Sequence, residues 1–228
     1  KELIPQGFVD IHSHILPGID DGAKNVKESI KLISEMKKLG FSKIIGTPHT
    51  YPGLYENSTD TIKRSFDLLK KVLKEDISID FASEYMIDTS LINRIREKSL
   101  LTLKDNYVLV EMNFMSAPNN LYEILFELKL NGYKPIMAHP ERYMHLSNKE
   151  FFKLKKFGCK FQLNLLSVSG YYNKEVVRKS EWLLRNEMIN FVGSDIHNMN
   201  HINQFKNKVK INEIGKFKKA IEANFSFR

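Results

Sequence analysis

The segment Phe8-Val-Asp-Ile-His-Ser-His14 is a short apolar run that ends in two histidines. Because side chains alternate between the two faces of a strand, the i, i+2 spacing of His12 and His14 puts both imidazoles on one face. Two imidazoles presented together are typical metal ligands. A similar pattern recurs far along the chain in Phe191-Val-Gly-Ser-Asp195-Ile-His197, where a carboxylate and an imidazole have the i, i+2 spacing after an apolar run. The segment therefore predicts a strand that delivers metal ligands from its carboxyl end.

Seven short runs rich in β-branched and aromatic residues can be marked in the 228 residues. They are Phe8–His14, Lys43–His49, Ser78–Tyr85, Tyr107–Asn113, Lys134–Pro140, Lys160–Leu165 and Ile189–Asp195. The stretches between them have helical periodicity, and three of these stretches stop at Gly40, Gly132 and Gly158. Regular alternation of strand and helix predicts parallel strands joined by crossover connections.

The carboxyl ends of these runs carry similar chemistry. Six of the seven end in residues that can bind a metal, namely His12 with His14, His49, Glu84, Glu111, His139, and Asp195 with His197. The sixth run has Gln162 and Asn164 instead. An open doubly wound sheet gathers ligands only near its switch point, whereas a closed α/β barrel brings all strand ends to one face. The distribution predicts an α/β barrel of seven units, with residues 1–228 as a single domain.

Each of these residues has an ordinary structural interpretation when taken alone, as a hydrogen-bonded histidine or a salt-bridged glutamate. Their shared position at one end of a barrel predicts a metal centre. The imidazoles and carboxylates outnumber what one ion can coordinate with a position left open, so two or three ions are expected. A hydroxide held between two metal ions is suited to in-line attack on phosphorus, and this points to phosphoester hydrolysis.

His139-Pro-Glu-Arg142 adds a guanidinium three residues after a proposed ligand. Arginine matches phosphate oxygens in a bidentate manner, so we expect Arg142 to contact the substrate, with a structural salt bridge as the alternative. Aromatic residues of the predicted loops, which could wall a pocket for an aromatic leaving group or simply pack, are Tyr51, Tyr55, Phe114, Tyr143, Tyr171 and Tyr172.

The composition argues against several other classes of protein. The net charge is +8, but only seven of 35 basic residues are arginine and no nucleic-acid recognition motif is present, so a lysine-rich solvated surface without a nucleic-acid partner is expected. The sixth residue after the single cysteine, Cys159, is Leu165, which excludes a phosphatase of the Cys-x5-Arg type. The lack of a disulfide framework favours a reducing, cytoplasmic compartment. No apolar run is long enough for membrane insertion.

These segments together resemble the bacterial PHP (polymerase and histidinol phosphatase) superfamily, and within it the manganese-dependent protein-tyrosine phosphatases of capsule and exopolysaccharide systems. The resemblance is carried by Val9–Gly22, Thr47–His49, Ala82–Tyr85, Leu109–Glu111, Ala138–Arg142, Gln162–Asn164 with Gly170–Tyr172, and Gly193–Asn198. It covers nearly the whole chain. It implies a distorted (β/α)7 barrel of PHP type, similar to a TIM barrel, and a trinuclear centre. Manganese is the expected ion, although iron, zinc and magnesium also accept mixed histidine and carboxylate sites.

The resemblance also implies how the ligands are shared. One ion would be bound by His12, His14, Glu84 and Asp195. A second would be bound by Glu84, as a bridge, with Glu111 and His139. The third would take His49, His197 and a carboxylate from either Asp20 or Asp21, a choice that the sequence leaves open.

Two residues are implied for phosphate binding. Arg142 matches the family's phosphate-contacting arginine. The family's second arginine corresponds to Ile202 in this chain, so His201 or Lys206 is expected to replace it.

The implied function is hydrolysis of phosphotyrosine on a protein, namely the tyrosine-rich tail of a membrane-anchored bacterial tyrosine kinase that regulates polysaccharide synthesis. A phenolate leaving group, with a pKa of about 10, needs little help from a general acid. The first alternative is a PHP phosphatase that acts on a small phosphomonoester such as histidinol phosphate, or a PHP nuclease. The second is a non-catalytic, metal-bound scaffold.

Overall fold

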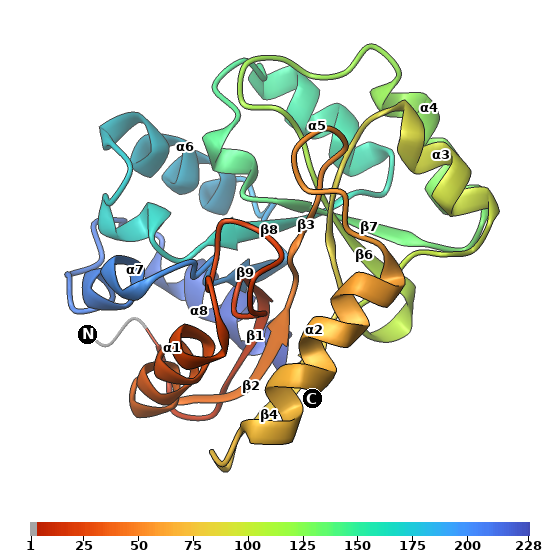
Figure 1. The fold of residues 1–228 in the computed structure, drawn as a ribbon. Coiled ribbons are helices and arrows are strands. Elements are labelled where there is room, and N and C mark those ends of the chain that lie inside the picture. Colours follow the sequence, from red (N-terminus) through yellow and green to blue (C-terminus); the bar gives the residue numbers. More distant parts are fainter. Residues whose placement is uncertain (1–3) are drawn as a thin grey trace.

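The computed structural model describes residues 4–228 and shows an α/β fold in which every pair of neighbouring strands is parallel (Figure 1). The strands are β1 (Phe8–Ser13), β2 (Phe41–Gly46), β3 (His49–Thr50), β4 (Ser78–Phe81), β5 (Glu84–Met86), β6 (Tyr107–Glu111), β7 (Lys134–Ala138), β8 (Lys160–Asn164) and β9 (Phe191–Gly193). The helices are α1 (Val26–Lys38), α2 (Thr59–Val72), α3 (Thr89–Arg96), α4 (Leu121–Leu130), α5 (Asn148–Lys156), α6 (Lys174–Arg185), α7 (Met199–Gln204) and α8 (Ile214–Ala223).

Two of the seven predicted strands are interrupted. The run Lys43–His49 gives β2 and β3, and the run Ser78–Tyr85 gives β4 and β5. Pro48 lies at the first break, where it has no N–H to donate to a ladder. Pairing nevertheless continues across both breaks, because the backbone N–H groups of Ala82 and Glu84 donate to the carbonyls of Gly46 and Pro48 at 2.9 and 3.1 Å. The chain therefore keeps seven strand positions, although the strands form two sheets.

The first and last strand positions are also neighbours. The two sheets have the orders β1-β2-β4 and β3-β5-β6-β7-β8-β9. An isolated parallel bridge joins Ser13 to Ile196. The N–H of Asp195 donates to the carbonyl of His12 at 2.8 Å, and the N–H of His14 donates to the carbonyl of Ile196 at 2.9 Å. Because the described residues form two sheets and not one continuous ladder, the barrel is distorted, as the sequence predicts.

Local capping groups and glycines mark the ends of the helices. Asn25 caps α1 by accepting from the N–H of Glu28, and Ser58 begins α2 with a reciprocal capping box. The three predicted glycine stops follow α1, α4 and α5, and each has a positive φ. No helix within residues 4–228 combines the length and apolarity needed to cross a membrane.

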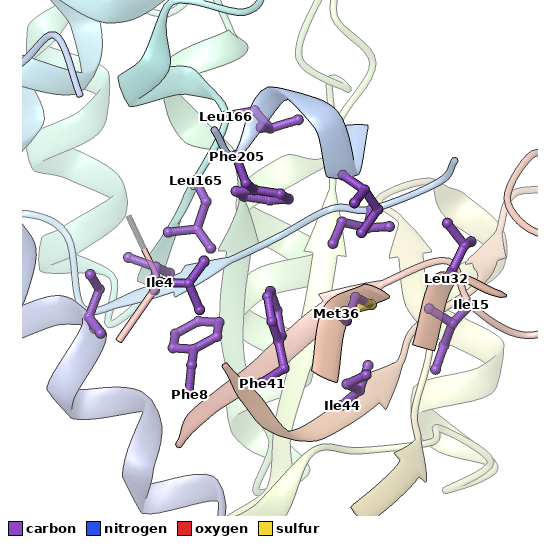
Figure 2. Packing of buried hydrophobic residues seen from close by; sticks show 14 of the residues in the cluster. Ile4, Phe8, Ile15, Leu32, Met36, Phe41, Ile44, Leu165, Leu166 and Phe205 are labelled. Atoms are coloured by element: carbon purple, nitrogen blue, oxygen red, sulfur yellow. The ribbon is translucent and has the colours of Figure 1, made fainter. Parts of the chain in front are cut away.

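The main core packs the first strands against α1 and the chain around α7 (Figure 2). The rings of Phe8 and Phe41 meet edge to face at 5.2 Å, and Phe41 also contacts Phe205. Burial of one such side chain contributes about 2 kcal/mol. At the amino ends of β6 and β9, Phe227 packs against Tyr107 and Phe191. The apolar packing thus holds the strands in place and leaves their carboxyl ends for polar groups.

Candidate metal centre

The carboxyl ends of the strands bring nine of the ten predicted ligands together. Four overlapping groups each contain ligand atoms that all lie within 4.8 Å of one another. The groups are His12 with His14 and Glu84, His12 with His139 and Asp195, His49 with Glu84 and Glu111, and His14 with Asp21, His49 and His197. Asp20 is the predicted ligand that belongs to none of these groups.

Glu84, at the start of β5, is the carboxylate that connects the cluster. Its Oε2 lies 3.2 Å from His12 Nε2 and 3.1 Å from His49 Nδ1, and its Oε1 lies 3.0 Å from His139 Nε2. Burial alone would raise the pKa of Glu84, but the neighbouring imidazoles outweigh this effect and hold the pKa well below its usual range. Glu84 accordingly belongs to two of the four ligand groups.

Asp195 follows β9 and faces the same imidazoles. Its Oδ1 lies 3.4 Å from the Nε2 atoms of both His12 and His14, while its Oδ2 accepts a hydrogen bond from Asn164 Nδ2 at 2.8 Å. Asp195 and His139 both have positive φ values, of 51° and 34°. Because residues other than glycine rarely adopt this backbone conformation, the chain is bent at both ligands in a way that packing must enforce.

Two of the imidazoles are oriented by a second partner. His12 Nδ1 donates to Gln162 Oε1 at 2.8 Å, and His14 Nδ1 donates to Asp20 Oδ2 at 2.7 Å. The Nε2 atoms of both rings consequently face Glu84. Such hydrogen bonds fix the tautomer and the ring orientation of metal-binding histidines. Asp20 thus lies behind His14, where it also accepts hydrogen bonds from backbone N–H groups.

Asp21 lies on the opposite, solvent side of the cluster. Its Oδ1 is 3.5 Å from His49 Nε2 and 3.4 Å from His197 Nε2, and the ring of His197 stacks on His14 with 3.8 Å between centroids. Burial raises the pKa of Asp21, but the lowering effect of His197 and His49 is larger, and the pKa falls to about 2. The geometry therefore distinguishes the two adjacent aspartates that the sequence could not separate.

Several buried polar atoms of the cluster lack a hydrogen-bond partner within residues 4–228. They are His49 Nδ1, Glu84 Oε2, Glu111 Oε1 and His139 Nδ1. His49 Nδ1 lies only 2.8 Å from Glu111 Oε1, but not in hydrogen-bonding geometry. Buried polar atoms are nearly always satisfied in folded proteins. Imidazole nitrogens and carboxylate oxygens that converge without partners fit divalent metal ions.

Arg142 lies at the edge of the cluster between two aromatic rings. The centre of its guanidinium is 4.3 Å from the Phe114 ring and 4.5 Å from the Tyr172 ring, while Nη1 donates to Asp195 Oδ2 at 3.1 Å. Cation–π contacts with two rings restrict the guanidinium. The structural salt bridge weighed as the alternative is thus present, but it involves only one nitrogen of the guanidinium.

His201 and the loop aromatics occupy different environments. His201 Nδ1 lies 3.3 Å from the backbone nitrogen of His197, and its ring meets Tyr171 edge to face. Tyr55 stacks on His49 with 11° between the ring planes. Tyr143 is fully buried, and its hydroxyl accepts a hydrogen bond from the N–H of Met112, so it packs in the core instead of walling an open pocket.

Sequence reasoning missed the functional partners of the ligands. Asn164 donates to Asp195, and Glu141 Oε1 accepts hydrogen bonds from the backbone N–H of Asn164 and from Ser167 Oγ. Burial raises the pKa of Glu141 to about 7. Asp10 joins β1 to β9 by accepting from Ser194, and burial raises the pKa of Asp10 to about 6. The amides at the end of the sixth run were a usable signal, because they stand where the other runs have ligands.

Comparison with known proteins gives a consistent result. Residues 8–211 match the family model described as "Capsular polysaccharide synthesis, CpsB/CapC". The chain is 33% identical over 198 residues to the tyrosine-protein phosphatase YwqE of Bacillus subtilis, covering 84% of this chain and 78% of that protein. It is 30% identical over 203 residues to the tyrosine-protein phosphatase CpsB of Streptococcus pneumoniae, covering 84% of each.

The fold is similar to that of a solved relative. A structure from a study of YwqE from Bacillus subtilis and CpsB from Streptococcus pneumoniae, described there as unique metal-dependent tyrosine phosphatases, superposes with a TM-score of 0.82. The sequences are 29% identical, and the match covers 96% of this chain and 90% of that one. The chain belongs to the CpsB/CapC family.

Proposed function

We propose that this member of the CpsB/CapC family is a metal-dependent protein-tyrosine phosphatase. The observation that carries the proposal is the juxtaposition of the four ligand groups with Arg142, whose guanidinium is held at their edge. Metal-ligand clusters next to a fixed arginine suit the binding of a phosphate dianion. The relatives that are named tyrosine-protein phosphatases support the choice of phosphotyrosine.

We propose that the ligands divide among three ions. His12, His14, Glu84 and Asp195 would hold one ion, and Glu84 would bridge to a second ion held by Glu111 and His139. Asp21, His49 and His197 would hold a third. We assign Asp21 to this third set because its carboxylate faces both imidazoles, whereas the Asp20 carboxylate is used to orient His14.

Bound divalent ions would supply a water of lowered pKa and positive charge that offsets the charge of the phosphate oxygens. The chain's own contribution is to orient the phosphate. Phe114 and Tyr172 hold the guanidinium of Arg142 so that the nitrogens not used by Asp195 can donate to phosphate oxygens. His201, packed on the backbone that carries Asp195 and His197, is proposed as a weaker second contact. The tyrosinate needs little help from a general acid because its pKa is only about 10.

The metal, partner and location are further parts of the proposal. Manganese is the ion that we propose, and the substrate is a phosphotyrosine-bearing protein, in particular a membrane-anchored bacterial tyrosine kinase of capsule or exopolysaccharide synthesis. The match to the capsular polysaccharide synthesis family supports this context. The one cysteine, Cys159, is buried and free, which suits the reducing conditions of the cytoplasm.

Replacement of Arg142 tests the proposal. In manganese-loaded enzyme, Arg142→Ala should lower kcat/KM for a phosphotyrosyl peptide about a hundredfold, because a phosphate-stabilising contact is lost. Arg142→Lys should recover part of this loss, and the exposed Arg178→Ala is the matched control. Metal content is measured in each variant. Unchanged hydrolysis by an Arg142→Ala variant that keeps its metal would contradict the assigned role.

The choice of substrate is tested separately. The wild-type enzyme should hydrolyse the phosphotyrosyl peptide with a higher kcat/KM than histidinol phosphate, and should leave single-stranded DNA intact. A preference for histidinol phosphate would replace the proposal with a small-molecule phosphatase. If manganese stimulates no hydrolysis of any aryl phosphate, the chain is instead a metal-bound scaffold.

A further inference from the structure

A groove with a volume of about 330 Å³ lies directly beside the metal centre. One wall is formed by Lys24, Lys31 and Leu32, from the segment before α1 and from α1 itself. The other wall is formed by His197, with Met199 and Asn200 at the start of α7. Its volume is at the lower end of the range of ligand pockets.

The groove is continuous with the exposed side of the metal centre. His197 lines the groove and also belongs to the ligand group that contains Asp21. Asp21 has a side chain that is 52% exposed, whereas His12 and Glu84 are fully buried. Solvent therefore reaches the cluster on the side where the groove begins. A substrate whose phosphate is at the cluster would have its neighbouring residues along the groove.

The groove combines two cations with apolar surface. Lys24 and Lys31 are exposed, and neither takes part in an ion pair within the part of the chain that the structure describes. Glu28, the one carboxylate in the lining, is held by the backbone N–H of Lys24, which donates to its Oε2 at 3.0 Å. Met199, which is only partly buried, supplies apolar surface on the opposite wall. Two lysines and one glutamate leave the lining with a net positive charge.

We propose that this groove binds the polypeptide that flanks the phosphotyrosine, and that Lys24 and Lys31 select acidic side chains in it. The inference rests on the proposed phosphatase function, whose substrate it specifies. Positive charge opposite acidic side chains steers and positions a substrate, while the apolar surface accommodates its backbone and β-carbons. Lys24 lies three residues after Asp21 and belongs to none of the ligand groups. An acidic side chain of the substrate bound to Lys24 would therefore lie near the phosphotyrosine but outside the ligand cluster.

The test compares two phosphotyrosyl peptides that differ only in having glutamate or glutamine on both sides of the phosphotyrosine. With manganese present, the wild-type enzyme should have a KM about fivefold lower for the glutamate peptide, as expected for two exposed ion pairs. The preference should shrink in high salt. Lys24→Glu with Lys31→Glu should abolish or reverse it, and Lys24→Gln with Lys31→Gln should give an intermediate ratio. The matched control, Lys71→Glu with Lys74→Glu, changes exposed lysines on and after α2 and should keep the wild-type ratio.

The outcomes separate the inference from the function on which it rests. Equal KM values for the two peptides in the wild-type enzyme would overturn the groove assignment and leave the phosphatase function intact. An acidic preference that survives in the Lys24 and Lys31 double variants would also overturn it. Failure of the wild-type enzyme to hydrolyse either peptide would overturn the phosphatase function itself.

Discussion

The metal centre has a buried half and a rim half, and the two are built differently. The buried half consists of His12, His14, Glu84, Glu111, His139 and Asp195, which are at most 4% exposed. The rim half consists of Asp21, His49 and His197, which are partly exposed. In the buried half, neighbours such as Gln162 and Asn164 fix the ligands, whereas Asp21 faces solvent. Ligands that are fixed in advance lose less conformational freedom on binding, so we expect the buried half to bind metal more tightly.

The largest effect is expected where the two halves meet. Glu84 lies between imidazoles of both, so Glu84→Gln should remove metal from the buried and rim halves together and lower kcat/KM by about a thousandfold. Metal content after dialysis and hydrolysis of an aryl phosphate measure this. Glu123→Gln, on the exposed face of α4, is the isosteric control. If Glu84→Gln retained all its metal, Glu84 would not be the connecting ligand.

The two adjacent aspartates test the boundary between the halves. Asp21→Asn should release the rim ion while the buried half keeps its metal, and should lower kcat/KM by about a hundredfold. Asp20→Asn removes only the charge behind His14, so we expect a reduction of about tenfold, as is usual for groups that orient a ligand. The number of bound ions per chain separates the two variants. The comparison fails if Asp21→Asn loses all ions at once.

The protonation of His49 should differ between the metal-free and the metal-bound centre. Burial and His14 lower the pKa of His49, but Glu84 and Glu111 outweigh them and raise it to about 10. At pH 7 the metal must therefore displace a proton from this ring. The affinity for the metal should then fall about tenfold for each unit by which the pH is lowered, for each displaced proton. Calorimetry in buffers with different ionisation enthalpies should detect proton release. The absence of release would show that the rim imidazole is neutral beforehand.

The same ion pairs give the metal-free protein a pH-dependent stability. Because the folded pKa of His49 exceeds its unfolded value of about 6.5, its stabilising contribution is complete below pH 6.5 and is lost as the pH rises through about 10. The Tm of the metal-free protein should therefore fall over this range relative to that of His49→Gln. A parallel pH dependence in the two proteins would contradict the ion pairing.

The smallest effect is expected outside both halves, at Cys159. Burial raises the pKa of this thiol to about 12, so it is neither ionised nor accessible in the folded protein. Cys159→Ser should leave kcat/KM for a phosphotyrosyl peptide within about twofold and should cost about 1–2 kcal/mol of stability. Thiol reagents should react with the wild-type protein only after denaturation. Rapid modification with loss of activity would contradict this assignment.

The sequence was most informative where the ligands follow uninterrupted strands. Glu111 and His139 could be placed at one end of a barrel because β6 and β7 are regular apolar runs. The predicted runs Lys43–His49 and Ser78–Tyr85 continue through the breaks at Pro48 and after Phe81, where the ladder changes sheets. Local composition does not reveal at which residue a predicted strand passes from one sheet to the other.

The distinction between ligands and the groups that orient them was out of reach of the sequence. Asp20 and Asp21 are chemically identical neighbours, and only the turn that carries them decides which carboxylate faces His14 from behind. Glu141 is buried beside Arg142, and its carboxylate accepts a hydrogen bond from the backbone N–H of Asn164. Such roles depend on which residues far apart in the chain become neighbours.

The contact between β1 and β9 has a consequence for how the protein is made. Ser194 donates to Asp10 across 184 residues, and the ligands next to them on the two strands complete one cluster. During translation, His12 and His14 emerge early, but they lack Asp195 until the last strand has left the ribosome and docked. Contacts between such distant residues form late in folding, and metal then stabilises only the assembled state. We therefore expect a nascent chain to be inactive until β1 and β9 have docked.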